Sequence, residues 1–164
     1  MQGHLLKRAI IVATVLLNFG CDQFSKDMVR THVGHMEYKA VVRPFLILTN
    51  VENTGAMYGF GADFSPVIKI LLLQVLPMLV LLAILIRIVV NRKLGPWTVF
   101  AFACVIGGGL GNLVDRIARG SVTDFFQFRV GPIRSGIFNM ADVSVTLGVL
   151  FILALTLQQK KIQF

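Results

Sequence analysis

Long apolar segments alternate with polar stretches along the chain, and this pattern predicts helices that cross a membrane. The first apolar run, Ala9–Cys21, is short, but adjoining leucines and the aliphatic stems of Lys7 and Arg8 extend it toward the roughly 20 residues that a bilayer requires. The second contains Pro77, which predicts a kink. The predicted helices cover about residues 5–22, 67–90, 97–115 and 137–157.

A cleaved secretory signal is the alternative interpretation of the first segment, because basic residues precede an apolar run that ends at Gly20-Cys21. Asn18 and Phe19 argue against it, since lipoprotein cleavage sites carry small or aliphatic residues just before the Gly-Cys pair. We therefore expect a retained first helix and a single integral membrane domain over residues 1–164.

Two polar stretches carry strand patterns. The first is rich in residues that favour strands and is followed by the turn residues Asn53-Thr54-Gly55. The second, Val122–Val130, ends at Gly131-Pro132. We expect these strands to form a small sheet on the membrane surface, with Phe125, Phe126 and Phe128 near the interface.

Composition places the chain in the membrane class, since 55% of its 164 residues are hydrophobic and only 15% are charged, against about 25% charged in soluble domains. The net charge of +8 does not indicate a nucleic-acid partner, because the basic residues flank apolar segments. Anionic phospholipid headgroups fit this distribution better. Cys21 and Cys104 lack CxxC spacing, and His32 and His35 lack a third ligand, so no metal site is predicted.

The distribution of basic residues predicts the orientation. With four helices, one side of the membrane would hold seven basic residues and no acidic residue, including a compact cluster in the short loop 91–96. Cytoplasmic loops carry such clusters. We therefore expect both termini in the cytoplasm and the polar stretches on the outer side. The predicted fold is mainly α-helical, with four transmembrane helices and, on the outer side, a small β-sheet or cradle and a loop helix.

Candidate chemistry is concentrated between residues 107 and 142, where charged groups adjoin apolar segments. Such groups are expensive in a bilayer and usually mark function. The segment begins with a glycine cluster that lacks both a complete GxGxxG and a preceding strand, so close helix packing explains it better than nucleotide binding. It places three aspartates, two asparagines and an arginine against the apolar segments: Asp115, Asp124, Asp142, Asn112, Asn139 and Arg116.

Asp142 lies five residues beyond Ile137, or about 8 Å into the fourth predicted helix. It could simply pair with Arg116 and tie two helices together. If it instead approaches Asp124, the two carboxyl groups would share one proton and could activate water against a peptide bond. A proton-coupled transporter or a scaffold protein is the alternative, but a transporter would spread its carboxylates through the bilayer depth or show internal repeats.

Five short motifs resemble the bacterial lipoprotein signal peptidase family, signal peptidase II. They occur in the order that the family shows and, with the apolar segments, extend the resemblance over the whole chain. The motifs are Asp22-Gln23-x-Ser25-Lys26, Asn53-Thr54-Gly55-Ala56, Gly111-Asn112-x-x-Asp115-Arg116, Val122-x-Asp124-Phe125 and Phe138-Asn139-x-Ala141-Asp142.

The resemblance implies a monomeric, cofactor-free aspartic endopeptidase of the bacterial inner membrane. Such enzymes remove signal peptides from prolipoproteins, cut before a diacylglyceryl-modified cysteine and are inhibited by cyclic peptides such as globomycin. By the same resemblance, Asp124 and Asp142 would be the catalytic pair. Asp115 would orient Arg116, and Met57-Tyr58 departs from the family pattern near the substrate. The other matching residues would line or support the site: Asp22, Lys26, Asn53, Gly55, Asn112, Arg116 and Asn139.

Overall fold

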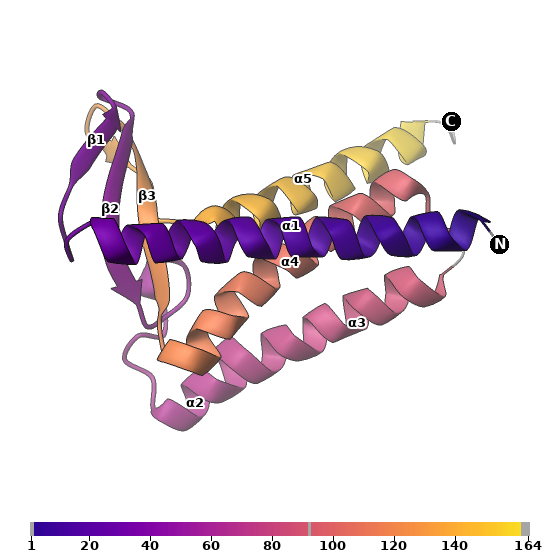
Figure 1. Ribbon diagram of the computed structural model, residues 1–164, viewed down its shortest axis with the longest axis horizontal. Helices are drawn as coiled ribbons and strands as arrows, with labels where there is room; N and C mark the ends of the chain where they lie inside the picture. Colours follow the sequence, from indigo (N-terminus) through magenta and orange to yellow (C-terminus); the bar gives the residue numbers. More distant parts are fainter. Residues whose placement is uncertain (1, 92, 162–164) are drawn as a thin grey trace.

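The computed structural model describes residues 2–91 and 93–161. Long helices run side by side, and a small sheet covers one end of the bundle (Figure 1). The helices are α1 (Gln2–His32), α2 (Pro66–Ile70), α3 (Leu76–Val90), α4 (Pro96–Arg119) and α5 (Met140–Lys161). The strands are β1 (Lys39–Val42), β2 (Leu46–Asn53), β3 (Val122–Val130) and β4 (Ile133–Arg134). A short 3-10 helix, η1 (Met57–Gly59), and a π-helical segment, η2 (Leu71–Val75), complete the described elements.

Among the described residues, three helical stretches are long and apolar enough to cross a membrane: Pro66–Val90, Pro96–Arg119 and Met140–Gln158. They correspond to the second, third and fourth predicted helices, which are confirmed as helices. Pro77 lies in the first turn of α3, separated from the end of η2 by Leu76 alone. Because proline lacks an N–H, the irregularity expected there takes the form of a π-helical segment.

The first predicted helix is present as α1, and it extends beyond the predicted membrane span of residues 5–22. α1 continues through Lys26 to His32. It stays helical because Asp22, Lys26 and Arg30, spaced four residues apart, turn one polar stripe toward α4 and β3, where each finds partners. A stretch that looks solvated in the sequence is therefore partly interior.

Glycines allow the helices around α4 to approach closely. A Cβ at Gly107 would lie 2.8 Å from the Asn18 side chain of α1, and one at Gly108 would collide with the Ala141 carbonyl of α5. On α5, a Cβ at Gly148 would lie 2.7 Å from the Ala101 carbonyl oxygen. The predicted packing function of the glycine cluster is confirmed, and α4 lies in contact with α1, α3 and α5.

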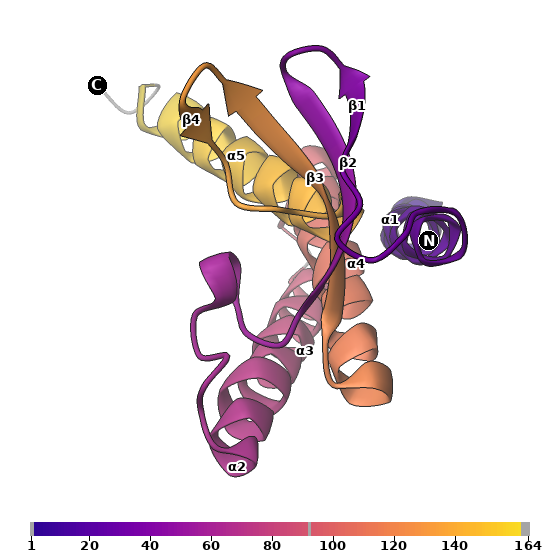
Figure 2. The same cartoon turned by 90° about the vertical axis from the view of Figure 1, so that its left-hand side faces the viewer.

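The sheet is antiparallel throughout, in the order β1-β2-β3-β4. It packs against the end of α1, where Val29 and Val33 surround Phe125 (Figure 2). Phe125 is 1% exposed, so its side chain is enclosed by protein and not available to lipid headgroups. Phe128, by contrast, is half exposed. Side chains alternate between the two faces of a strand. Phe125 and Phe128 are three positions apart on β3 and therefore fall on opposite faces.

Gly148→Ala is expected to lower the thermal unfolding temperature in detergent micelles. The new Cβ would crowd the Ala101 carbonyl and lie 2.8 Å from Val105 Cγ2, and such overpacking typically costs about 1–3 kcal/mol. Gly20→Ala is the matched control, because a Cβ there has nothing within 4 Å and alanine favours a helix by up to about 1 kcal/mol. An unchanged midpoint for Gly148→Ala would contradict the packing analysis.

Candidate active site

Asp124 and Asp142 meet at one asparagine where the sheet covers the helix bundle. Asp124 lies near the start of β3, and Asp142 lies in the first turn of α5. The Asn139 side chain donates a hydrogen bond to Asp124 Oδ1 at 2.6 Å, while its backbone N–H donates to Asp142 Oδ2 at 3.1 Å. The two carboxyl groups, eighteen positions apart in sequence, thus share a partner.

Asn139 and Asp142 cap α5 reciprocally. The Asp142 N–H donates to Asn139 Oδ1 at 3.0 Å, and the Asn139 N–H donates to the Asp142 carboxylate. This is the geometry of a capping box, with aspartate in place of the usual glutamate. α5 therefore begins at Met140, and the expectation that Asp142 lies about 8 Å inside the helix was wrong. An anionic side chain is also stabilised at a helix N-terminus.

Asp124 occupies a nearly dry position, with 4% of the residue exposed. Besides Asn139, it accepts a hydrogen bond from Asn53 Nδ2 at 3.0 Å. Burial, which disfavours the ionised form, raises the pKa of Asp124 to about 6. The hydrogen bond from Asn53 opposes this increase, and the nearby Asp142 charge adds to it. A proton on Asp124 is therefore available just below neutral pH.

Asn112 joins Asp142 to the interior of the bundle. Its Nδ2 donates to Asp142 Oδ1 at 2.8 Å, and its Oδ1 accepts hydrogen bonds from Asn139 Nδ2 at 3.0 Å and Lys26 Nζ at 2.9 Å. An ammonium group can only donate. Lys26 therefore determines the orientation of the Asn112 amide. The amide oxygen faces Lys26, and the amide N–H₂ group faces Asp142.

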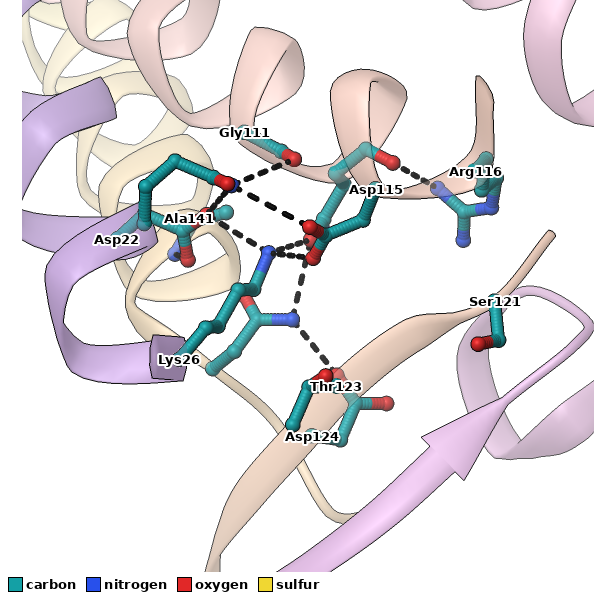
Figure 3. A network of polar contacts seen from close by, with 12 residues as sticks. Asp22, Lys26, Gly111, Asp115, Arg116, Ser121, Thr123, Asp124 and Ala141 are labelled. Carbon is teal, nitrogen blue, oxygen red and sulfur yellow. Dashed lines mark hydrogen bonds and ion pairs between the residues drawn. The ribbon is translucent and has the colours of Figure 1, made fainter. Parts of the chain in front are cut away.

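Lys26 is fully buried between two carboxylates. Its Nζ lies 2.7 Å from Asp22 Oδ2 and 2.8 Å from Asp115 Oδ2, and neither carboxylate is more than 1% exposed (Figure 3). Asp22 also accepts a hydrogen bond from the Ala141 N–H of α5 at 2.8 Å. These contacts tie α1, α4 and α5 together next to Asn112.

The resemblance had implied that Asp115 orients Arg116, but the structure shows other partners for Asp115. It pairs instead with Lys26 and with Arg30, whose Nη2 lies 3.0 Å from Asp115 Oδ1. Arg116 donates to the Gly55 carbonyl oxygen at 3.0 Å. Among the described residues it forms no ion pair with Asp142, so simple helix-to-helix pairing does not explain that carboxylate.

The turn after β2 contributes the remaining wall of the site. Asn53 Oδ1 accepts a hydrogen bond from the Gly55 N–H at 2.9 Å, and Asn53 Nδ2 also donates to Ala56 O at 3.1 Å. A Cβ at Gly55 would lie 2.6 Å from the Phe60 carbonyl oxygen, which explains the glycine. The expected residues Asn53, Gly55 and Arg116 are therefore adjacent, and Asn53 connects them to Asp124.

Residues outside the five motifs also support the site. Arg30 reaches Thr123, the residue before Asp124, with 2.7 Å between Nε and Oγ1. Glu52, the residue before Asn53, accepts a hydrogen bond from the same hydroxyl at 2.6 Å. One signal for Arg30 is present in the sequence, because this residue continues the four-residue spacing of Asp22 and Lys26. The contact with Thr123 depends on tertiary structure.

Comparison with known proteins identifies related chains of nearly the same length. The sequence model of a family described as signal peptidase (SPase) II matches residues 14–158. The lipoprotein signal peptidase of Syntrophus aciditrophicus is 33% identical over 161 residues, which cover 98% of each chain. That of Streptococcus pneumoniae is 31% identical over 154 residues, 94% of this chain and 96% of its own.

Two solved structures, each described as a bacterial membrane enzyme, have a similar fold. One has a TM-score of 0.78 at 26% identity and covers 94% of this chain and 89% of its own. The other has a TM-score of 0.74 at 26% identity, with 93% and 92% coverage. The similarity therefore includes both the helices and the sheet.

Lys26→Met is expected to destabilise the protein by about 3–5 kcal/mol, because it leaves two buried carboxylates without their shared cation. Thermal unfolding in micelles would measure the loss. Lys39→Met is the control, since Lys39 pairs with Glu37 at the surface at 3.2 Å and exposed pairs contribute little. Equal unfolding midpoints for the two variants would argue against the buried network.

Proposed function

The chain belongs to the signal peptidase II family, and on that premise we propose that Asp124 and Asp142 are the catalytic pair of an aspartic endopeptidase. It is a lipoprotein signal peptidase, a membrane protease that removes signal peptides from prolipoproteins. The observation that carries the catalytic assignment is the position of Asn139, which donates one hydrogen bond to each carboxyl group.

The proposed chemistry divides the work between the two carboxyl groups. Asp142 is the base, because Asn112 and the Asn139 backbone donate to its oxygens and stabilise its charge. It takes a proton from a water molecule as the water oxygen attacks the scissile carbonyl carbon. Asp124 carries the shared proton and donates a hydrogen bond to the carbonyl oxygen. After the attack the pair holds two protons, its original one and the one taken from water. When the C–N bond breaks, one of these protons passes to the leaving amine, and the pair returns to its starting state with a single proton.

Neighbouring groups would hold the peptide against this pair. Arg116 and the turn at Asn53 and Gly55 lie beside Asp124, joined by the contact between Arg116 and the Gly55 carbonyl. A guanidinium group and backbone groups of this kind suit the carbonyl oxygens of an extended peptide. We assign Asn53, Gly55, Asn112, Arg116 and Asn139 to substrate binding or to support of the site.

The site is proposed to lie at the outer leaflet, with α1 as the fourth transmembrane helix and both termini in the cytoplasm. The sheet lies at one end of the bundle, while the start of α1 and the end of α5 lie at the other (Figure 1). Asp124 belongs to β3 of that sheet. Lys7, at that other end, donates to the Asn91 carbonyl oxygen at 2.6 Å. Basic residues favour the cytoplasmic side, which supports this orientation.

The proposed substrates are prolipoproteins whose cysteine carries a diacylglyceryl group. A site at the edge of the bilayer would let the acyl chains remain in lipid while the peptide reaches the aspartates. Surrounding phospholipids would contact the exposed apolar helix faces. A cyclic peptide of the globomycin type would compete for the same site, and we propose that the protein acts as a monomer.

Asp124→Asn and Asp142→Asn are each expected to reduce cleavage of a lipid-modified prolipoprotein by at least about a thousandfold, because each removes a proton-transfer group. The mobility shift of the processed lipoprotein on a gel would measure cleavage in proteoliposomes. Glu37→Asn, at an exposed turn, is the control and should cleave normally. Full cleavage by either aspartate variant would exclude the catalytic pair.

Asn53→Ala is expected to move the alkaline limb of the pH profile of kcat/KM to higher pH. In the unsubstituted enzyme, activity should fall as pH rises through about 6, because Asp124 loses its proton. The hydrogen bond from Asn53 favours the ionised carboxylate and lowers the pKa of Asp124, so removing it raises that pKa.

Thr54→Ala, at the exposed next residue, is the control for this measurement. Its profile should superimpose on that of the unsubstituted enzyme. A limb that stays in place or moves to lower pH in Asn53→Ala would contradict the assignment of Asp124 as the proton-carrying group.

A further inference from the structure

We propose that Arg30 is a positioning residue that holds the strand of Asp124 against the helix of Asn112. The inference rests on the proposed function, because it concerns the distance between the two aspartates. Arg30 donates its hydrogen bonds to Thr123 and Asp115, and not to Asp124 or Asp142. Its effect would therefore pass through the elements that it joins.

Arg30 bridges two elements with one guanidinium group. Its Nη2 lies 3.0 Å from Asp115 Oδ1 on α4, and its Nε lies 2.7 Å from Thr123 Oγ1 on β3. The side chain is only 15% exposed, and Thr123 is fully buried. Because the guanidinium is planar with fixed donor directions, two bonds from one group constrain the relative position of α4 and β3.

The Thr123 hydroxyl passes this constraint to β2. Since it accepts from Arg30, its own proton is directed to Glu52 Oε1, 2.6 Å away. Ser121 donates to the other oxygen of Glu52 at 2.5 Å. Glu52 and Thr123 are paired residues in the β2–β3 ladder, so these contacts set the register of the two strands beside the site.

The opposite face of the same strand pair carries the chemistry. Side chains alternate along a strand, so Thr123 faces α1 while Asp124 faces Asn139. Likewise Glu52 precedes Asn53, which donates to Asp124. Arg30 therefore contacts the face of the strand pair that lies opposite the aspartates. It bonds Thr123, the residue before Asp124, and through Thr123 it is linked to Glu52, the residue before Asn53.

A simple charge-balancing function would not require this geometry. Lys26 already lies 2.8 Å from the other oxygen of Asp115, and the contact from Arg30 Nε goes to a neutral hydroxyl. A displacement of about 1 Å between reacting groups can reduce rate about a hundredfold. Loss of the contact to Thr123 should therefore lower kcat more than it changes KM.

Thr123→Val and Thr123→Ser provide the direct test. Valine has nearly the shape of threonine but no hydroxyl, so we expect kcat for lipid-modified prolipoprotein to fall about ten- to a hundredfold with KM within threefold. Serine keeps the hydroxyl and should retain nearly normal kcat. Unchanged kcat in a folded Thr123→Val protein, or equal losses in both variants, would overturn the inference.

Arg30→Met should reproduce the loss of kcat, and the double variant with Thr123→Val should be no slower than the slower single variant, because both changes break the same contact. Arg119→Met, which removes an exposed arginine from the last turn of α4, is the matched control and should keep normal kcat. Multiplicative losses in the double variant would also overturn the inference.

Thermal unfolding shows whether Arg30→Met folds. If it does not, the Thr123 variants alone test the positioning function of Arg30. Failure of the catalytic assignment gives a different pattern. Full cleavage by Asp124→Asn would remove the aspartic mechanism itself. An inactive Asp124→Asn combined with a fully active Thr123→Val would overturn only the function of Arg30.

Discussion

The buried ammonium group of Lys26 constrains the site more than any other single group. It has no exposed surface and lies within 2.9 Å of Asp22, Asn112 and Asp115. A buried cation without such partners would be strongly unfavourable. Those partners belong to α1 and α4, and Asp22 also bonds the start of α5. Satisfying one charge therefore brings three helices together and orients the amide beside Asp142.

Helix and sheet supply the two aspartates in different ways. Asp142 takes part in the capping box of α5, so its backbone position is determined by where that helix begins. Asp124 lies on a strand whose position depends on contacts with α1, α4 and β2. Because the position of the strand depends on these contacts, side chains that hold it from the α1 side, such as Arg30, become relevant to the chemistry.

The family match and the local geometry support each other at different levels. Similarity along nearly the whole chain identifies a lipoprotein signal peptidase. It does not describe how this chain holds its polar residues. Asp115 illustrates the difference, since it contacts Lys26 and Arg30 here, whereas the expectation from the motif was an interaction with Arg116.

Local patterns in the sequence were sufficient to predict the apolar helices, the strand at 122–130 and the close packing of the glycines. Hydrophobic periodicity and short motifs reflect interactions between residues that are close in sequence, and helices, strands and helix-packing glycines depend largely on such local patterns. The sequence did not indicate that α1 extends to His32 or that Phe125 is buried, and the expected start of the last helix at residue 137 was wrong, because α5 begins at Met140. Each depends on partners distant in sequence, because only the folded chain brings Asp115, Thr123 and Ala141 against α1.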